Sequence, residues 1–136
     1  MGTRGVATAG LSLTGSLTRA ARAVAARVEE VLAKEGLTLD QWLVLDVLSG
    51  KGGLAMADLA DRTLATGPTL TRVVDKLVTT AQAYREVDAA DRRRVLVHLS
   101  ARGRATHRRV AAKVSEVEAR LEVADEVLVA LRSLGD

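Results

Sequence analysis

Residues 85–99 read Arg85-Glu-Val-Asp-Ala-Ala-Asp-Arg-Arg-Arg-Val-Leu-Val-His-Leu99, and this stretch decides the fold. Two aspartates precede three consecutive arginines, and apolar side chains then recur at every second position. Alternation with a period of two indicates a half-buried strand. One face carries Val95, Val97 and Leu99, and the other carries Leu96 and His98. The stretch therefore predicts a β-hairpin with a basic tip, a shape that fits a DNA groove.

The residues ahead of this hairpin predict two short helices joined by a tight turn. Residues 56–63 form the first helix, with Leu59 and the small Ala60 facing inward, and residues 64–67 form the turn. The second helix begins at Pro68, because at the first helical position the N–H that proline lacks would make no hydrogen bond within the helix. This arrangement describes a helix-turn-helix, whose second helix enters the major groove of DNA. An ordinary helical hairpin is the alternative for the pattern alone, but the basic hairpin downstream favours a winged helix. The apolar face of the second helix is Leu70, Val73, Val74 and Leu77.

We expect the start and the polar face of this second helix to contact DNA. Arginine can bond a guanine in two places, and threonine can touch a thymine methyl group or a phosphate. For Lys76, pairing with Asp75 along the helix is the alternative. The candidate residues are Thr66, Gly67, Pro68, Thr69, Thr71, Arg72 and Lys76.

Composition limits the remaining function classes. The chain has 136 residues, which favours one domain, and its single proline and few glycines beyond the first ten residues favour a mainly helical fold. It has no cysteine, so disulfides, thiolate metal sites and cysteine-based redox sensing are excluded. There is no apolar run of membrane-spanning length and no signal-peptide pattern, so we expect a cytoplasmic protein without a membrane partner.

Positive charge gathers in the middle of the chain. Residues 62–109 hold eleven basic and four acidic residues, although the net charge of the whole chain is only +3. A local excess of this kind attracts polyanions such as nucleic acid. A solvated basic surface without a partner is the alternative for charge alone.

Amphipathic helices flank the predicted winged helix. The helix over residues 11–34 ends at Gly36, and Thr38 and Gln41 fit a capping box for a central, buried helix. Ser100 can cap a helix running to about Leu121. The outer apolar stripes exceed what one small core needs, which predicts a homodimer; packing on their own domain is the alternative. These stripes are Leu13, Leu17, Ala20, Val24, Val28 and Val31, then Val110, Val114, Val117 and Leu121, and last Val127, Leu131 and Leu134.

Three parts of the sequence resemble the MarR family of bacterial transcription regulators. They are Leu-Thr-Leu-Asp-Gln-Trp at 37–42, Thr-Gly-Pro-Thr-Leu-Thr-Arg-Val-Val-Asp-Lys-Leu at 66–77 and Asp-Ala-Ala-Asp-Arg-Arg-Arg-Val-Leu-Val-His-Leu-Ser-Ala-Arg-Gly at 88–103. The resemblance implies a winged helix-turn-helix, mainly α with a small β-hairpin wing, and N- and C-terminal dimerisation helices. The expected parts are a flexible tail over 1–10, a dimerisation helix over 11–36, a DNA-binding lobe over 37–99 and dimerisation helices over 100–136.

The resemblance also implies a function. Members of the family are homodimers that bind palindromic double-stranded operators, mostly as repressors, and many are released by small phenolic or anionic molecules. In the wing, Arg93 would enter the minor groove and Asp91 would hold the tip by pairing with an arginine, while Arg92 and Arg94 contact phosphates or face solvent. Narrow minor grooves attract arginine. Asp88 is expected to act as a turn residue.

Two departures from the family pattern and one ligand hypothesis complete the expectations. Ala55 stands where a Ser or Thr often caps the first helix of the motif, so that cap is expected to be missing. Gln82 and Ala83 replace apolar residues ahead of the wing, which we expect to weaken its anchoring. An effector pocket could be floored by Trp42, with Arg19 or Arg22 binding an anion; for Trp42, a core position is the alternative.

The competing function classes have less support. His98 and His107 have no accompanying carboxylate cluster and match no zinc spacing, so we expect surface histidines, no metal, no cofactor and no enzyme. A winged helix that binds protein instead of DNA is the alternative function. Such a module would not need three arginines at the tip of its wing.

Overall fold

The computed structural model describes residues 12–50, 52–63 and 65–136. The tail predicted over 1–10, Leu11 at the start of the predicted first helix, and Leu64 in the predicted turn lie outside these residues. In order, the elements are α2 (Leu13–Lys34), α3 (Leu39–Ser49), β1 (Leu54–Ala55), α4 (Met56–Thr63), α5 (Gly67–Thr79), β2 (Ala83–Val87), β3 (Val95–Leu99), α6 (Ala101–Ala119) and α7 (Asp125–Gly135). The predicted mainly helical winged-helix fold is confirmed. Among these residues no helix is long and apolar enough to cross a membrane.

The central helix α3 begins and packs as its sequence predicts. Thr38 Oγ1 accepts the Gln41 amide and the Gln41 side chain accepts the Thr38 amide, so the predicted capping box is confirmed. Apolar residues on several sides of α3 are buried, as expected for a helix without a polar face. The core around α3 takes Leu32 from α2, Leu59 from α4, Leu70, Val74 and Leu77 from α5, Val97 from β3 and Val110 from α6.

The small sheet has one strand more than the sequence predicts. Its order is β1-β3-β2, all antiparallel, and β1 pairs Leu54 with Val97 and Ala55 with Leu96. A two-residue strand is too short to show a period in the sequence. Because β1 runs directly into α4 at Met56, this pairing attaches the first helix of the helix-turn-helix to the wing. Ala55, the residue expected to be unable to cap α4, is a strand residue at this junction.

Two helix ends differ slightly from the predictions, and a third agrees with them. The helix α5 begins at Gly67, so Pro68 takes the second helical position instead of the first. Proline still costs no helical hydrogen bond there, because amides of the first helical turn have no acceptor within the helix. The helix α6 ends at Ala119, not near Leu121, and a left-handed Glu122 (φ 53°) follows. The helix α2 ends as predicted before a left-handed Gly36 (φ 72°).

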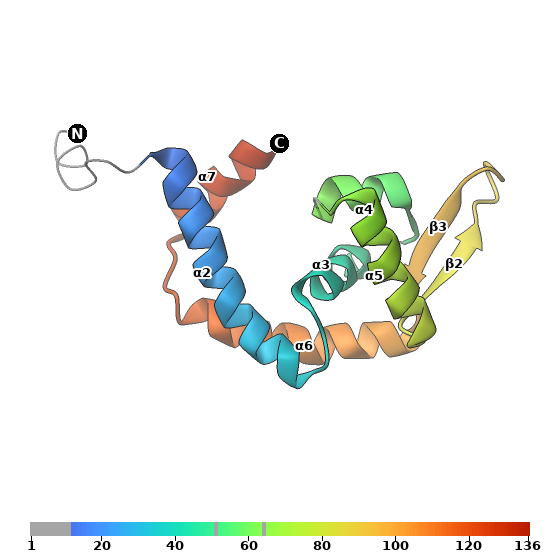
Figure 1. The fold of residues 1–136 in the computed structure, drawn as a ribbon, viewed down its shortest axis with the longest axis horizontal. Coiled ribbons are helices and arrows are strands. Elements are labelled where there is room, and N and C mark those ends of the chain that lie inside the picture. Colours follow the sequence, from blue (N-terminus) through green and yellow to red (C-terminus); the bar gives the residue numbers. More distant parts are fainter. Residues whose placement is uncertain (1–11, 51, 64) are drawn as a thin grey trace.

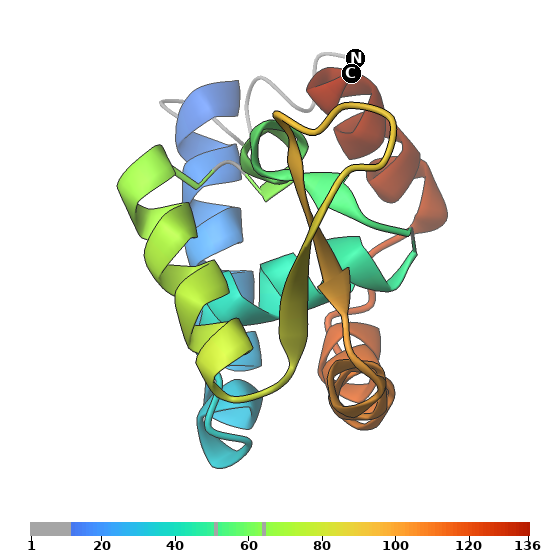
Figure 2. The same ribbon diagram turned by 90° about the vertical axis from the view of Figure 1, so that its right-hand side faces the viewer.

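The last helix, α7, stands apart from the winged helix, whereas α2 packs on α3 and α6 through Val28 and Leu32. Figure 1 shows α2 and α7 at one end of the molecule and the wing at the other, with α6 spanning the distance between them. Viewed from the wing, α3 lies behind the hairpin and α5 flanks it (Figure 2). None of the residues of α7 is buried. The alternative that the last apolar stripe packs on its own domain is therefore wrong for α7.

Candidate nucleic-acid interface

The helix α5 offers its N-terminal end and one polar face to solvent. Its apolar face of Leu70, Val73, Val74 and Leu77 is buried, as predicted. The N-cap residue Thr66 makes no side-chain cap; its hydroxyl donates to Thr69 Oγ1 at 3.1 Å instead. The first turn has no acidic residue, so no carboxylate neutralises the positive end of the helix dipole. The free amides there are available to an anionic ligand. The sequence-predicted residues Thr66, Gly67, Pro68, Thr71, Arg72 and Lys76 are exposed, and Thr69 is half-buried.

Asp75 does not pair along its helix with Lys76. Its Oδ1 atom lies 2.5 Å from Nη2 of Arg85, a residue of β2. The alternative of a pairing between Asp75 and Lys76 within α5 is therefore wrong. The ion pair instead joins the recognition helix to the first strand of the wing and leaves Lys76 exposed without a carboxylate partner in the described part of the chain.

The tip of the wing is a hydrogen-bonded turn that presents Arg93. The Asp88 amide donates to the Arg94 carbonyl at 3.0 Å, and Asp88 Oδ1 accepts the Ala90 amide at 2.9 Å, which is the turn role expected of Asp88. Asp91 Oδ1 accepts both the amide and Nε of Arg93, at 3.1 Å and 3.2 Å. Both bonds lower the pKa of the Asp91 carboxyl, and the bond from the Arg93 side chain has the larger effect. The Arg93 side chain is still 91% exposed.

The other two tip arginines differ from each other. Arg94 Nη2 lies 3.6 Å from Asp58 Oδ2 in the first turn of α4. Arg92 is exposed and has no ion pair with any residue that the structure describes. The sequence, with three identical residues in a row, does not predict these different surroundings.

Backbone contacts hold the base of the wing despite its unusual residues. The Gln82 amide donates to Leu77 and its carbonyl accepts the Ser100 amide, at 2.8 Å and 3.1 Å. Gly103 packs so closely that a Cβ there would lie 2.0 Å from the Gln82 carbonyl oxygen. Ala83 is buried opposite Leu99. The side-chain oxygen Oε1 of Gln82, however, is buried without a hydrogen-bond partner, which is a real cost of a polar residue here.

Both histidines are half-buried, so they are less exposed than the expected surface histidines. His107 stacks on Trp42 with ring centroids 5.1 Å apart, and its Nε2 lies 2.9 Å from Asp46 Oδ1. His98 stacks on Tyr84 at 5.0 Å, with Nε2 3.5 Å from a Glu86 carboxylate oxygen. The aromatic partners come from other elements, which a sequence pattern does not bring together. No cluster of three metal-ligating side chains occurs among residues 12–50, 52–63 and 65–136.

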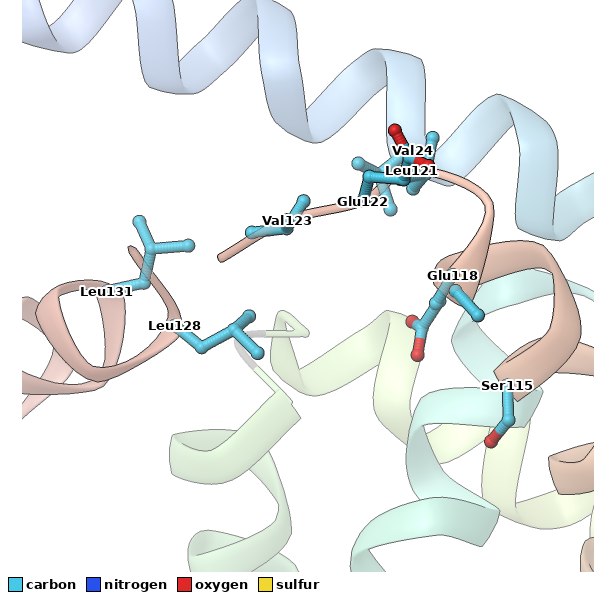
Figure 3. A pocket seen from close by; sticks show the side chains of 9 residues that line it. Val24, Ser115, Glu118, Leu121, Glu122, Val123, Leu128 and Leu131 are labelled. Carbon is cyan, nitrogen blue, oxygen red and sulfur yellow. The ribbon is translucent and has the colours of Figure 1, made fainter. Parts of the chain in front are cut away.

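The predicted ligand residues are only partly brought together. Trp42 is buried, as the core alternative has it, and also lines a groove formed by α2, α3 and α7. Neither Arg19 nor Arg22 lines this groove; its one charged residue is Glu118. A neighbouring cavity of about 460 Å³ shares Val24, Glu118 and Leu131 with it. Figure 3 shows this cavity between α2, the end of α6 and α7, lined by apolar side chains and a few polar ones.

Comparison with known proteins decides the family. The sequence model described as "MarR family" matches residues 35–94. The HTH-type transcriptional repressor Rv2887 of Mycobacterium tuberculosis is 33% identical over 94 residues, which are 69% of this chain and 68% of that protein. This chain belongs to the MarR family. Family membership places it among helix-turn-helix transcriptional regulators.

Solved structures agree with this MarR assignment. NadR in complex with 4-hydroxyphenylacetate is 25% identical, with a TM-score of 0.82 over 93% of this chain and 91% of that one. The S. aureus MepR–DNA complex is 22% identical, with a TM-score of 0.75 over 90% of this chain and 93% of that one. The second likeness concerns the fold alone. Both support the winged helix and the flanking helices that the sequence predicts.

Proposed function

We propose that this MarR-family chain represses transcription by binding a palindromic DNA operator as a homodimer, in the compartment that holds the chromosome, the cytoplasm. One observation carries the proposal: the same lobe has a recognition helix, α5, without an acidic residue in its first turn and a wing with the highly exposed Arg93. A helix of this kind reads the major groove, and an arginine on a wing fits the adjacent minor groove. The DNA complex of MepR supports the same use of this fold.

The proposed DNA contacts divide into two sets. Base and phosphate contacts in the major groove would come from Thr66, Gly67, Pro68, Thr69, Thr71, Arg72 and Lys76. In the wing, Arg93 would enter the minor groove, Asp91 would hold the tip, and Arg92 would meet a phosphate. Arg94, paired with Asp58, is less available for DNA than the sequence alone implies.

The homodimer is proposed from the uncovered apolar residues of the terminal helices. Exposed large apolar side chains gather on and before α7, and such a surface needs a partner. Twofold symmetry would place two recognition helices about 34–36 Å apart, one turn of DNA. The exposed residues are Val123, Val127, Leu128, Val129, Leu131 and Leu134, together with Leu13 at the start of α2.

A selection of bound sequences from random DNA tests the whole proposal. We expect a palindromic consensus with half-sites about 10 base pairs apart. We also expect the logarithm of the affinity to fall linearly with the logarithm of the salt concentration, because phosphate contacts release counterions. Absence of any enriched sequence, with a flat salt response, would favour the protein-binding alternative.

We further propose that a small aromatic effector occupies the groove beside Trp42 and releases the operator. NadR binds 4-hydroxyphenylacetate, and Trp42 gives the groove here an aromatic wall. Because Arg19 and Arg22 do not line the groove, they would bind an anionic group only from outside it. Trp42 is the single tryptophan, so its fluorescence should change on titration with 4-hydroxyphenylacetate while operator binding weakens. Unchanged fluorescence and unchanged DNA binding at millimolar concentrations would argue against phenolic acids as effectors.

A further inference from the structure

The three consecutive arginines of the wing have three different surroundings. Arg93 is bonded to Asp91 within the tip and projects into solvent, and Arg92 has no carboxylate partner in the described residues. Arg94 alone turns back toward the helix-turn-helix, where its Nη2 atom lies 3.6 Å from Asp58 Oδ2. Identical side chains in one run are thus suited to different tasks.

The position of the Arg94–Asp58 pair in the fold matters more than its distance. Ala55 of β1 pairs with Leu96 of β3, so the chain leaving β1 toward α4 lies opposite the chain entering β3 from the wing. Asp58 is three residues beyond Ala55, and Arg94 is two residues before Leu96. The ion pair therefore continues the β1–β3 pairing by one further connection, made by side chains, just where the backbone ladder stops.

We propose that Asp58 is a positioning residue for the wing, and that Arg94 anchors the wing to α4 instead of contacting DNA. The proposal rests on the proposed DNA-binding function and adds a division of labour among the three arginines. The pair holds the angle between the wing, which reads the minor groove, and the helices that place α5 in the major groove. A wing free to swing would lose part of its affinity to the entropy of ordering it on DNA.

For removal of Asp58, the proposal and simple electrostatics predict opposite changes in operator affinity. Removing an acidic residue near DNA should strengthen binding, because its repulsion of phosphates is lost. If Asp58 positions the wing, Asp58→Ala instead weakens operator binding by about two- to fivefold, the range of a half-exposed ion pair. Asp61→Ala is the matched control: Asp61 lies exposed on the same helix without an ion pair in the described chain, and its removal should leave affinity equal or slightly higher.

The salt dependence separates an anchor from a phosphate contact. Arg92→Ala should reduce the slope of log affinity against log salt by about 0.9, the value for one lost phosphate contact. Arg94→Ala should weaken binding about as much as Asp58→Ala and leave the slope unchanged. The double variant should be no weaker than either single one, and Asp58→Glu, which keeps the carboxylate, should restore wild-type affinity.

A measurement without DNA keeps this inference separate from the proposed function. Hydrogen exchange of the wing amides, including the Asp88 amide bonded to the Arg94 carbonyl, should become faster in Asp58→Ala and stay unchanged in Asp61→Ala. Stronger operator binding by Asp58→Ala, a reduced salt slope in Arg94→Ala, or unaltered exchange in the wing would each overturn the proposal. A wild-type protein that binds no DNA but shows the exchange difference would overturn only the proposed function.

Discussion

The winged-helix lobe, residues 37–99, and the last helix α7 differ in how they bury leucine and valine side chains. In the lobe, these side chains gather around α3 together with leucines and valines of α2 and α6, and the buried ones have almost no accessible surface. In α7, a comparable density of leucine and valine leaves every residue exposed. The apolar side chains of the lobe are therefore buried within this chain, with the help of α2 and α6, whereas the described residues leave the apolar surface of α7 uncovered. The two regions should respond differently to substitution.

The largest effect is expected where α7 carries its apolar surface. Leu131→Asp should convert the proposed dimer to monomer, because burial of a leucine contributes about 1.5–3 kcal/mol and a twofold interface counts it twice. The dissociation constant should rise a hundredfold or more, as measured by light scattering across a concentration series. Ser133→Asp, on the same helix but polar to begin with, is the control and should stay dimeric. A dimer unchanged by Leu131→Asp would remove α7 from the interface.

Where α6 meets the base of the wing, the largest effect is expected at Gly103. A methyl group there would lie 2.0 Å from the Gln82 carbonyl oxygen, so Gly103→Ala must separate α6 from the base of the wing. We expect a loss of about 2–3 kcal/mol in the free energy of unfolding, measured in urea, as for other overpacked sites. Gly50→Ala is the control, since nothing lies within 4 Å of its added atom. Equal stability of the two variants would mean that the wing base is loosely packed.

The two regions also differ in how far the sequence could predict them. Periods of two and of three to four residues predicted the hairpin and the helices, because each such pattern is local. The strand β1, the Asp75–Arg85 pair and the stacking of His107 on Trp42 were not predictable, since each depends on how separate elements pack together and not on a pattern within one element. The same reason separates Arg92, Arg93 and Arg94, whose residue type is identical and whose partners are not.

On the DNA side of the lobe, Arg93→Ala tests the tip of the wing. We expect operator binding to weaken by about 1–3 kcal/mol, the range for an arginine that reads a groove. Because the side chain is 91% exposed, the unfolding midpoint should stay the same. Arg120→Ala, an exposed arginine at the end of α6 remote from the wing, controls for general loss of positive charge. Wild-type affinity in the Arg93 variant would remove this residue from the interface.

A smaller, stabilising effect is expected at Ala81, which connects α5 to β2. It has a left-handed backbone (φ 62°), a conformation that costs a residue with a Cβ about 1–2 kcal/mol. Ala81→Gly removes this cost but makes the unfolded chain more flexible, so we expect a net gain of about 0.5–1 kcal/mol in unfolding free energy. Ala83→Gly, two residues on in β2 and buried, should lose stability instead. A destabilised Ala81→Gly variant would show that its methyl group packs favourably.

The smallest effect is expected at Glu35, where the end of α2 meets α6. Bonds from Lys113 and, at 3.0 Å, from Arg109 lower the pKa of this carboxyl below its usual value of 4.5. A group whose pKa is depressed by folding stabilises the protein above its unfolded pKa, and this contribution is lost as the pH falls through the folded pKa. The stability difference between wild type and Glu35→Gln, measured in urea, should therefore shrink as the pH is lowered from about 6 to about 3.

Glu30→Gln is the control for Glu35→Gln. Glu30 lies exposed on the same helix and has no ion pair with the described residues, so its difference from wild type should not vary in this way with pH. A constant difference for Glu35→Gln as well would mean that Lys113 and Arg109 do not hold the carboxylate in solution. The connection between α2 and α6 would then depend on apolar packing, mainly of Val28, Leu32, Val110 and Val114, which belong to the same core that fills the lobe.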